Sequence, residues 1–438
     1  MNSNSPKALH LVFNSVREDS RVLKVAWSLA NSGWEVLVVG ATKTNINDEF
    51  YIGRARVLRL PLKIVVKGSL VKNFGRVVRK AKNLTKRFLL IPSKTNSNKF
   101  SGIPNLAKAL KTLEPVVMQF KPDVIHAHDY TILPVAGRLI EYLEKNGLTS
   151  KLIYDAHEYV PGVAHLKPGV REAYILEERK WSKNSAAVLS VSEGMSELLI
   201  PHLEINFRPK IVANDPLVDG QIPAKQSMRT QAGLINQEPI MVYSGAVAPQ
   251  RGLHTAVAAL RQMPKVHLVV IVDPSNLTIQ KLLAENSDLA NRIHVLPYVP
   301  NNELVSYLKE ADIGLIPLLH RLNHEISLIT KFGEYMQARL PILVSDVKTM
   351  SDQVKLLGNG EVFIAEDVED FVKKASLILN QKEKYQKSYT PDILRERSWE
   401  KQAENLINIY LEVSGKNTEF VEPAKFELTE PISVRQLF

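Results

Sequence analysis

Short apolar runs alternate with longer amphipathic segments along most of this chain. The apolar runs are rich in Val, Ile and Leu, as expected for strands buried on both faces of a parallel sheet. We expect strands at Leu9–Phe13, Glu35–Gly40, Asp123–His128, Lys151–Asp155, Ala187–Ser192, Ile211–Ala213, Ile240–Ser244, His267–Val272, Arg292–Leu296, Ile313–Pro317 and Pro341–Ser345. The segments between them predict helices at Ser20–Asn31, Asn105–Gln119, Ile132–Lys145, Glu193–His202, Leu253–Gln262 and Asn302–Glu310. This alternation predicts doubly wound α/β sheets.

A break in the pattern divides the chain. The stretch Asp215–Glu238 is polar, is punctuated by Pro and Gly, and contains no strand pattern, so we interpret it as an interdomain linker. The sequence predicts an N-terminal Rossmann-like domain at 1–215 and a C-terminal one at 216–398. A last helix within 399–415 and an extended or mobile tail at 416–438 follow them. Ligands of such sheets bind outside the carboxyl ends of the strands, so the site should lie between the domains.

The composition is that of an ordinary globular protein, with 45% hydrophobic and 23% charged residues among 438. There is no cysteine, which excludes disulfides, thiolate metal ligands and cysteine nucleophiles. The N-terminal residues lack the pattern of a signal peptide, and no apolar run reaches the roughly 18 residues that a membrane span needs. We therefore expect a cytoplasmic protein, with a location at the inner face of the cytoplasmic membrane left open.

Basic residues are concentrated in one segment. The formal net charge is +10, and the stretch between Phe50 and Leu113 contains 16 Lys or Arg and no Asp or Glu. Within residues 63–91, apolar and basic side chains interleave at roughly helical spacing. Such a segment can lie on anionic lipid, at about 1 kcal/mol per well-placed basic residue. The alternatives are a solvated basic face and, least favoured, nucleic acid, which we do not expect as a partner.

One candidate binding motif runs from Tyr243 to Leu253, from a strand end through a turn into a helix. Gly245 permits a sharp turn, and the helix that we expect to start near Arg251 offers free N–H groups. Together with the Arg251 guanidinium, these groups suit an anionic diphosphate. The alternative is a plain strand-to-helix turn with a surface arginine.

A second motif follows Glu325 and ends in a buried strand. Ser327 and Thr330 are placed where a helix starts, so they are suited to capping it. The Glu334 carboxylate is expected on the buried side of that helix, where it is costly unless paired or bound to a ligand such as ribose. The alternative is an i,i+3 pair with Lys331, worth a few tenths of a kcal/mol.

This second motif resembles the donor-binding signature of retaining glycosyltransferase family 4, in the form S-x-P-x-K-x-x-E-Y-M-A-x-G-x-P. The matching residues are Ser327, Lys331, Glu334, Tyr335, Met336 and Pro341. Ile329 replaces the first proline, and the glycine is replaced within 338–340. The 243–253 loop is similar to the family's G-R-x-x-x-x-K-G turn, with Arg251 in place of the lysine but Ala246 in place of the arginine.

The likeness covers nearly the whole chain and implies a GT-B fold, with two Rossmann-like domains facing a central cleft. It implies metal-independent, retaining transfer from a nucleotide-diphosphate sugar, without a cofactor, to a saccharide or lipid-linked acceptor in surface polysaccharide or glycolipid assembly. The donor-binding residues that it implies are Gly245, Arg251, Tyr298, Ser327, Thr330, Lys331 and Glu334. It also implies that the last helix crosses back onto the N-terminal domain.

His157 is the main catalytic candidate. It directly follows a strand at the carboxyl edge of the first predicted sheet, and the resemblance places it near the donor sugar. The alternative is a histidine that ties down its own loop through Asp155 or Glu158. His126 and His128 point to one face of a strand, but no third ligand is evident, so we expect no metal.

Departures from the family pattern leave a second hypothesis open. The turn Asn14–Arg21 has no glycine, and the second carboxylate of the E-x7-E variant would fall at Ile326, with the catalytic candidate Glu325 one position away. Together with Ala246, these changes allow a weak or inactive GT-B relative that acts as a binding or scaffold partner. A nicotinamide oxidoreductase is disfavoured because no G-x-G-x-x-G follows a strand. The sequence names neither sugar, base, acceptor nor oligomeric state.

Overall fold

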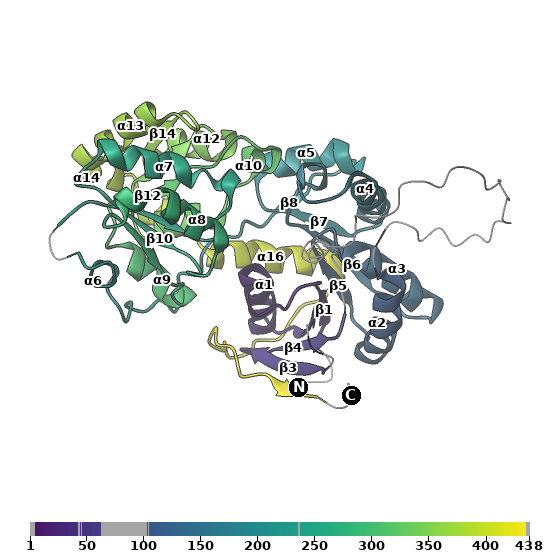
Figure 1. Ribbon diagram of the computed structural model, residues 1–438. Coiled ribbons are helices and arrows are strands. Elements are labelled where there is room, and N and C mark those ends of the chain that lie inside the picture. Colours follow the sequence, from purple (N-terminus) through teal and green to yellow (C-terminus); the bar gives the residue numbers. More distant parts are fainter. Residues whose placement is uncertain are drawn as a thin grey trace, which may run out of the picture.

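Two sheets, one from each half of the chain, form the framework of the computed structural model (Figure 1). It describes residues 5–42, 44, 46–62, 103, 105–234 and 237–434. Among these residues the first sheet has nine strands in the order β15-β3-β4-β2-β1-β5-β6-β7-β8. Its strands are β1 (Lys7–Leu11), β2 (Glu35–Ala41), β3 (Asp48–Ile52), β4 (Ala55–Leu60), β5 (Val124–His128), β6 (Lys151–Ala156), β7 (Ala187–Ser190), β8 (Lys210–Ile211) and β15 (Ile432–Ser433). All pairs are parallel except those that involve β3.

The second sheet is parallel throughout, in the order β11-β10-β9-β12-β13-β14. Its strands are β9 (Ile240–Ser244), β10 (His267–Ile271), β11 (Ile293–Leu296), β12 (Ile313–Ile316), β13 (Ile342–Ser345) and β14 (Gly360–Phe363). The doubly wound architecture expected from the apolar runs is therefore present in both halves.

The helices between these strands are α1 (Ser20–Asn31), α2 (Leu106–Phe120), α3 (Leu133–Lys145), α4 (Pro168–Lys183), α5 (Glu193–Leu203), α6 (Met228–Gln231), α7 (Leu253–Ala259), α8 (Leu277–Glu285), α9 (Asn301–Leu308), α10 (Leu322–Ile326), α11 (Thr330–Gln337), α12 (Lys348–Leu357), α13 (Val368–Asn380), α14 (Lys382–Gln386), α15 (Pro391–Glu396) and α16 (Trp399–Ser414). Within the described ranges, none of these helices has the length and apolar character that crossing a bilayer requires.

Helices cover both faces of each sheet. In β1, Leu9 and Leu11 belong to the apolar core beneath α2 and α3, while Ala8 belongs to the core beneath α1 and α16. This division follows from the alternation of side chains along a strand. It explains why the side chains on both faces of the central strands are buried. The predicted basic membrane segment, residues 63–91, lies outside the described residues.

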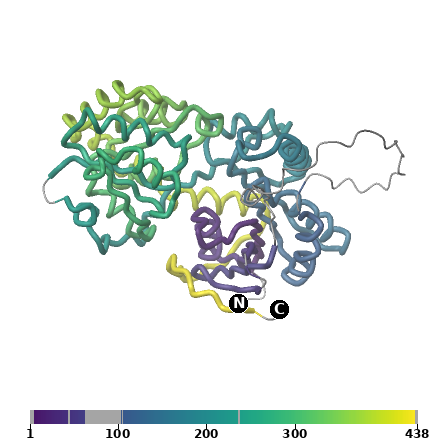
Figure 2. The backbone as a smooth tube through the Cα atoms, viewed as in Figure 1, coloured from purple at the N-terminus to yellow at the C-terminus, as the bar shows by residue number. Residues whose placement is uncertain are grey.

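Helix α16 joins the two halves of the molecule. It follows the second sheet and packs on α1, where Trp399 Nε1 donates to Ser28 Oγ at 2.9 Å. The Gln402 side chain accepts from Ala213 N at 3.0 Å and donates to the Asp215 carboxylate at 3.1 Å. The helix therefore contacts the first domain and the start of the linker together (Figures 1 and 2).

The tail after Gly415 is extended but docked on the N-terminal domain (Figures 1 and 2). The Asn31 side chain donates to Ala424 O at 2.9 Å and accepts from Ala424 N at 3.0 Å. Phe426 packs edge-on against Trp27, with ring centroids 5.5 Å apart. Further along, β15 adds an antiparallel strand to β3. A polar tail binds in this way because most of its contacts use the backbone, which composition does not reveal.

Candidate active site

A cavity of about 1090 Å³ lies between the two domains and is lined by both. Its walls come from the loops that follow the carboxyl ends of β1, β6 and β7 on one side and of β9, β10 and β11 on the other. This is the position expected for ligands of doubly wound sheets. The expected site residues that line it are His157, Gly245, Arg251, Tyr298, Ser327, Thr330, Lys331 and Glu334.

The turn after β9 forms part of the C-terminal wall. Gly245 has φ +110°, a conformation that side-chain-bearing residues rarely adopt. At Gly252, φ is +72° and a Cβ would meet Pro317 O at 1.7 Å, so this position also requires glycine. The helix that follows, α7, has only seven residues and begins at Leu253. Arg251 ends a short 3-10 turn before it, and the guanidinium lines the cavity.

Helix α11 places a lysine and a glutamate on this wall. Lys331 is only 9% exposed, and its Nζ lies 3.5 Å from the centroid of the Tyr243 ring. Burial, together with nearby Arg251, holds the pKa of Lys331 well below its usual range, although Glu334 acts in the opposite direction. Burial raises the pKa of Glu334, against the pull of Lys331 and Lys24.

The two charges on α11 are not paired with each other. Salt bridges among the described residues include no Lys331–Glu334 contact within 4.0 Å, so the simple i,i+3 pair is not formed. Buried charges without a partner are costly, which points to a ligand that supplies the missing contacts. Thr330 and Ser327 do not cap α11, whose N-cap residue is Ile329. Instead, Thr330 Oγ1 accepts from Asn214 Nδ2 at 3.0 Å, across the interdomain boundary.

The N-terminal wall is built around Asp155, at the end of β6. Its carboxylate is fully buried and accepts two bonds from the Arg21 guanidinium, at 2.6 and 2.8 Å. Burial alone would raise the pKa of Asp155, but Arg21, His157 and the other neighbouring histidines together outweigh burial and hold that pKa well below the usual range. The carboxylate is therefore ionised at neutral pH and is the fixed anion of this wall.

His157 lies beside this anion, with Nε2 at 3.1 Å from Asp155 Oδ2. Its side chain is 20% exposed and lines the cavity. Burial acts to lower the pKa of His157, but the Asp155 carboxylate outweighs it, so the pKa is raised above the ordinary value. The two interpretations made from the sequence therefore coexist, because His157 contacts Asp155 and faces the cavity.

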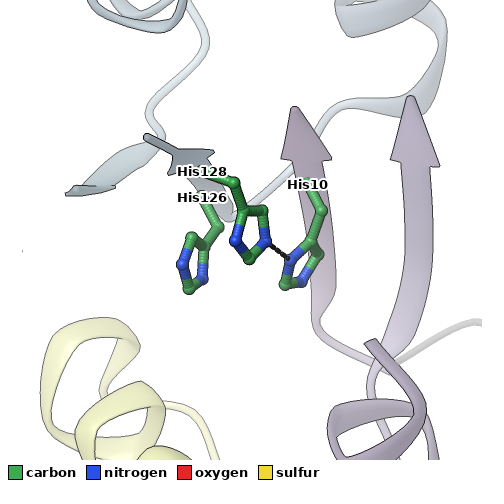
Figure 3. Close-up of side chains that lie close together, drawn as sticks. All are labelled: His10, His126 and His128. Carbon is green, nitrogen blue, oxygen red and sulfur yellow. Dashed lines mark hydrogen bonds between the residues drawn. The ribbon is translucent and has the colours of Figure 1, made fainter. Parts of the chain in front are cut away.

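The sequence did not reveal a third histidine in this region. His10 on β1 lies beside His126 and His128 on β5, and all three are fully buried (Figure 3). The potential ligand atoms lie within 4.8 Å of one another, but the rings of His126 and His128 are stacked, 4.2 Å apart and 11° from parallel. Lone pairs in parallel rings do not converge on a metal. A second group, formed with Asp155, contains a carboxylate already neutralised by Arg21.

Matches to known families agree with this geometry. Residues 224–390 match the profile described as glycosyl transferases group 1, and residues 19–213 match the glycosyl transferase 4-like domain. The chain belongs to this glycosyltransferase family. As a family 4 member it is a nucleotide-sugar glycosyltransferase of the retaining hexosyltransferase class. No curated protein sequence matches it significantly.

Solved structures confirm the GT-B fold of this family 4 member. Sucrose-phosphate synthase from Thermosynechococcus elongatus superposes with a TM-score of 0.70 at 17% identity, covering 94% of this chain and 100% of that one. HepE from Anabaena in complex with UDP gives 0.64 at 12% identity, with 92% and 99% covered. The catalytic domain of starch synthase IV from Arabidopsis thaliana, bound to ADP and acarbose, gives 0.62 at 13% identity, with 94% and 100% covered.

Glu325 is the expected site residue that the structure does not bring to the cavity. Its Oε1 lies 2.5 Å from His320 Nδ1, and its Oε2 accepts from Lys348 N, at the start of α12, at 2.8 Å. One carboxylate oxygen thus joins α10 to α12, and the other binds the loop that precedes α10. The geometry supports a structural role for Glu325, and it gives no support to the catalytic one.

Other cavity residues were missed by sequence reasoning. Arg21 and Asn214 line the cavity, and each bonds a residue distant in sequence, Asp155 and Thr330 respectively. A signal for Arg21 was present, because it lies with Lys24 on the buried face of the amphipathic helix α1. A basic residue on a buried helix face needs a polar or acidic partner, whereas a basic residue on a solvated face does not. This difference distinguishes Arg21 from the basic residues of exposed surfaces.

Lys331 provides a test of the donor wall that does not depend on catalysis. An anionic diphosphate beside Lys331 should raise its depressed pKa, so binding should take up a proton at any pH between the free and bound values. We expect this uptake within a series of measurements from pH 7 to pH 10, where the terminal phosphate is already ionised. Calorimetry of UDP or ADP in two buffers of different ionisation enthalpy measures it.

The matched variant for this test is Lys331→Arg, because a guanidinium remains charged and takes up no proton. It should bind with little or no proton uptake, while Lys281→Arg at an exposed position should behave as the wild type. Binding to the wild type with equal heats in both buffers would contradict the assignment of Lys331.

Proposed function

We propose that this family 4 member transfers a hexosyl group from a nucleotide-diphosphate sugar to a hydroxyl of a saccharide or lipid-linked acceptor, in surface polysaccharide or glycolipid assembly. The observation that carries the proposal is the contrast between the two walls of the cavity. One wall presents Arg251, Lys331 and Glu334 without ion-pair partners among the described residues, and the other presents His157 on a saturated Asp155. The first suits a nucleotide diphosphate and the second suits a sugar.

On the C-terminal wall, we assign the diphosphate to Arg251 and Lys331, with the glycine turn at Gly245 allowing close approach of the backbone. The Glu334 carboxylate then accepts bonds from the ribose hydroxyls, and backbone near Tyr298 meets the base. Tyr298 is 55% exposed at the cavity edge, where a planar base has room to lie. Serine and threonine at 327 and 330 complete the donor site.

In the transfer step, the bond between the anomeric carbon and the diphosphate oxygen breaks, and the electron pair leaves with the nucleoside diphosphate. Arg251 and Lys331 stabilise the developing negative charge, so the proposal requires no metal. A new bond forms to the acceptor oxygen, and the proton of that hydroxyl passes to the departing diphosphate oxygen, which carries the negative charge. His157 uses Nε2 for Asp155, so Nδ1 is the ring nitrogen available to the sugar. Closure of the two domains excludes water and favours transfer over hydrolysis.

The scaffold alternative rests on Ala246, which is exposed where the family signature has an arginine. The cavity is still lined by two other basic residues, Arg251 and Lys331. The absence of an arginine at position 246 therefore leaves basic groups that can bind a diphosphate. We therefore favour an active enzyme. Its donor base is left open, since the fold neighbours named above contain UDP in one case and ADP in another.

Glu334→Ala tests the donor site. Charged hydrogen bonds are worth roughly 1.5–3 kcal/mol, so losing the ribose contacts should weaken the binding of the preferred nucleoside diphosphate about 10- to 100-fold. Calorimetry against UDP, ADP and GDP measures this, after a thermal-shift screen. Glu383→Ala, an acid on α14 that does not line the cavity, is the control. Unchanged affinity in a folded Glu334→Ala protein would refute the ribose role.

The membrane contact is tested separately, with anionic and neutral liposomes. We expect the wild type to co-sediment with vesicles that contain anionic lipid, because each basic residue adds about 1 kcal/mol. Replacing Arg79, Lys80, Lys86 and Arg87 with Ser should release it, whereas the same change at Lys281, Lys355, Lys373 and Lys384 should not. If the two variants co-sediment equally with anionic vesicles, residues 63–91 are not the membrane contact.

A further inference from the structure

A second, smaller cavity lies at the junction of the two domains. Its volume is about 60 Å³, and its walls come from α1, the interdomain linker, α9, α11 and the C-terminal tail. Lys24 lines it from the N-terminal domain, and Thr330 and Glu334 line it from the C-terminal domain. Because Thr330 and Glu334 also line the main cavity, the two spaces share a wall. We call this smaller cavity, between Lys24 and Glu334, the junction pocket.

Lys24 is a buried cation that the N-terminal domain holds at this pocket. Its side chain is on the buried face of α1 and only 4% exposed. Its Nζ donates to the backbone oxygen of Asp215 at 2.5 Å and lies 4.6 Å from the centroid of the Trp399 ring on α16. Figure 1 shows α1 beside α16, which leads away from the second domain. The ammonium is therefore fixed where the linker leaves the first domain.

Glu334 faces the same pocket from α11. The linker packs closely on this helix at the preceding residue, Gly333, where an added Cβ would lie 2.7 Å from Pro216 Cδ and 3.1 Å from Asp215 Oδ1. The linker that binds Lys24 thus also contacts the turn of α11 that carries Glu334. In the described part of the chain, no salt bridge within 4.0 Å joins Lys24 and Glu334. The two groups therefore interact across the junction pocket, where water has room to lie between them.

Each of these charges affects the ionisation of the other. Burial raises the pKa of Glu334, while Lys331 and Lys24 act against burial. Burial also lowers the pKa of Lys24 to about 7, while Asp215 and Glu334 act against burial. The charged groups that face this pair are Arg21 on α1, Asp215 in the linker, Lys331 on α11 and Glu400 on α16. Among them, Lys24 and Lys331 are the cations that favour the ionised form of Glu334.

We propose that Lys24 is a positioning residue for the donor: across the junction pocket, its ammonium stabilises the ionised Glu334 carboxylate that accepts the ribose hydroxyls. The proposal rests on the ribose role of Glu334 proposed above. A protonated carboxyl loses acceptor capacity, so the charge of Lys24 favours ribose binding. The donor site is then not complete within the C-terminal domain, because α1 of the N-terminal domain supplies a cation to it.

The buried ammonium itself argues against a purely structural role. Tying α1 to the linker carbonyl of Asp215 requires one hydrogen-bond donor, which a neutral side chain can supply. Burying an ammonium costs far more than burying an amide or a hydroxyl. A charge at this position is therefore explained better by the carboxylate across the junction pocket than by the bond to the linker.

The first experiment follows Glu334 by 13C NMR in the full chain, labelled at glutamate Cδ and with the signal assigned from Glu334→Gln. Lys24→Met removes the ammonium and keeps an unbranched stem beside Trp399. We expect the pKa of Glu334 to rise by about one pH unit, a tenfold change in its protonation equilibrium. Lys151→Met, at an exposed position at the amino end of β6, should leave it unchanged. An unchanged pKa of Glu334 in folded Lys24→Met would overturn the proposal.

Glu334→Gln supplies the reciprocal readout, which remains available if Lys24→Met does not fold. The coupling between two sites acts equally in both directions. We therefore expect the pKa of Lys24 to fall from about 7 by the same pH unit. 13C NMR of lysine Cε measures this, with Lys331→Arg used to distinguish the two buried lysines. A Lys24 pKa that is the same in both proteins would contradict the coupling.

The pH dependence of donor binding tests the link to the proposed function. The probe is UDP-glucose or ADP-glucose, whichever binds the wild type more tightly, because their diphosphates lack the ionisation near pH 6 of a terminal phosphate. Lys24→Met should bind up to about tenfold more weakly at the acid end of the series. It should bind equally at pH 9, where Lys24 of the wild type is largely neutral.

A purely structural effect of Lys24→Met would weaken binding by the same factor at every pH, and that result would overturn the proposal. The two experiments also separate the two assignments. If the pKa of Glu334 rises in Lys24→Met while the affinity for the nucleotide sugar is unchanged at every pH, the ribose role of Glu334 fails. The electrostatic coupling between Lys24 and Glu334 then still stands.

Discussion

The Asp155–Arg21 ion pair is the interaction on which the N-terminal half of the site depends. Arg21 uses Nε and one terminal nitrogen for Asp155 and the other for the carbonyl of Val212, at 2.7 Å. It therefore ties α1, β6 and the segment leading into the linker to one point. Asp155 in turn holds His157. Removing either partner would leave an uncompensated buried charge, which is strongly destabilising.

The two walls of the cavity follow opposite electrostatic designs. On the N-terminal wall the Asp155 carboxylate is saturated, because it accepts from Arg21 and from His157. On the C-terminal wall, Lys331 lies over the Tyr243 ring and Glu334 has no ion-pair partner among the described residues. A wall built on a fixed ion pair suits the orientation of a sugar, while a wall with unpaired charged groups gains its missing contacts when the anionic donor binds. Helix α16 and the Asn214–Thr330 bond connect the walls across the boundary.

Much of the fold was predictable because its central strands are rich in Val, Ile, Leu and Ala. The strands predicted from those runs are present with ends shifted by a residue or two. The strands that were missed lie at or near the edges of the sheets: the β3–β4 hairpin, β14 and β15 mix polar and apolar positions. Several helices were missed as well, α4 and α13 among them. The partners of the missed strands are chosen by tertiary contacts, which a local pattern does not contain.

The donor wall was also predictable, since its residues lie in two short local motifs around Arg251 and Lys331. The N-terminal wall was not. Arg21 reaches Asp155, and His10 reaches His128, only because β1 and β6 flank β5 in the sheet and α1 packs on the same face as these side chains. Glu325 shows the opposite case. It lies close to the signature in sequence, but it belongs to the short helix α10, where its carboxylate binds Lys348 N and does not line the cavity.

The central claim is that a donor sugar bound between these walls is transferred with its anomeric configuration retained. Time-resolved 1H NMR measures this most directly, using the nucleotide sugar that binds most tightly and water as the acceptor, before the released sugar equilibrates. The account predicts that the first sugar to appear has the anomeric configuration of the donor. First release of the opposite anomer would contradict it.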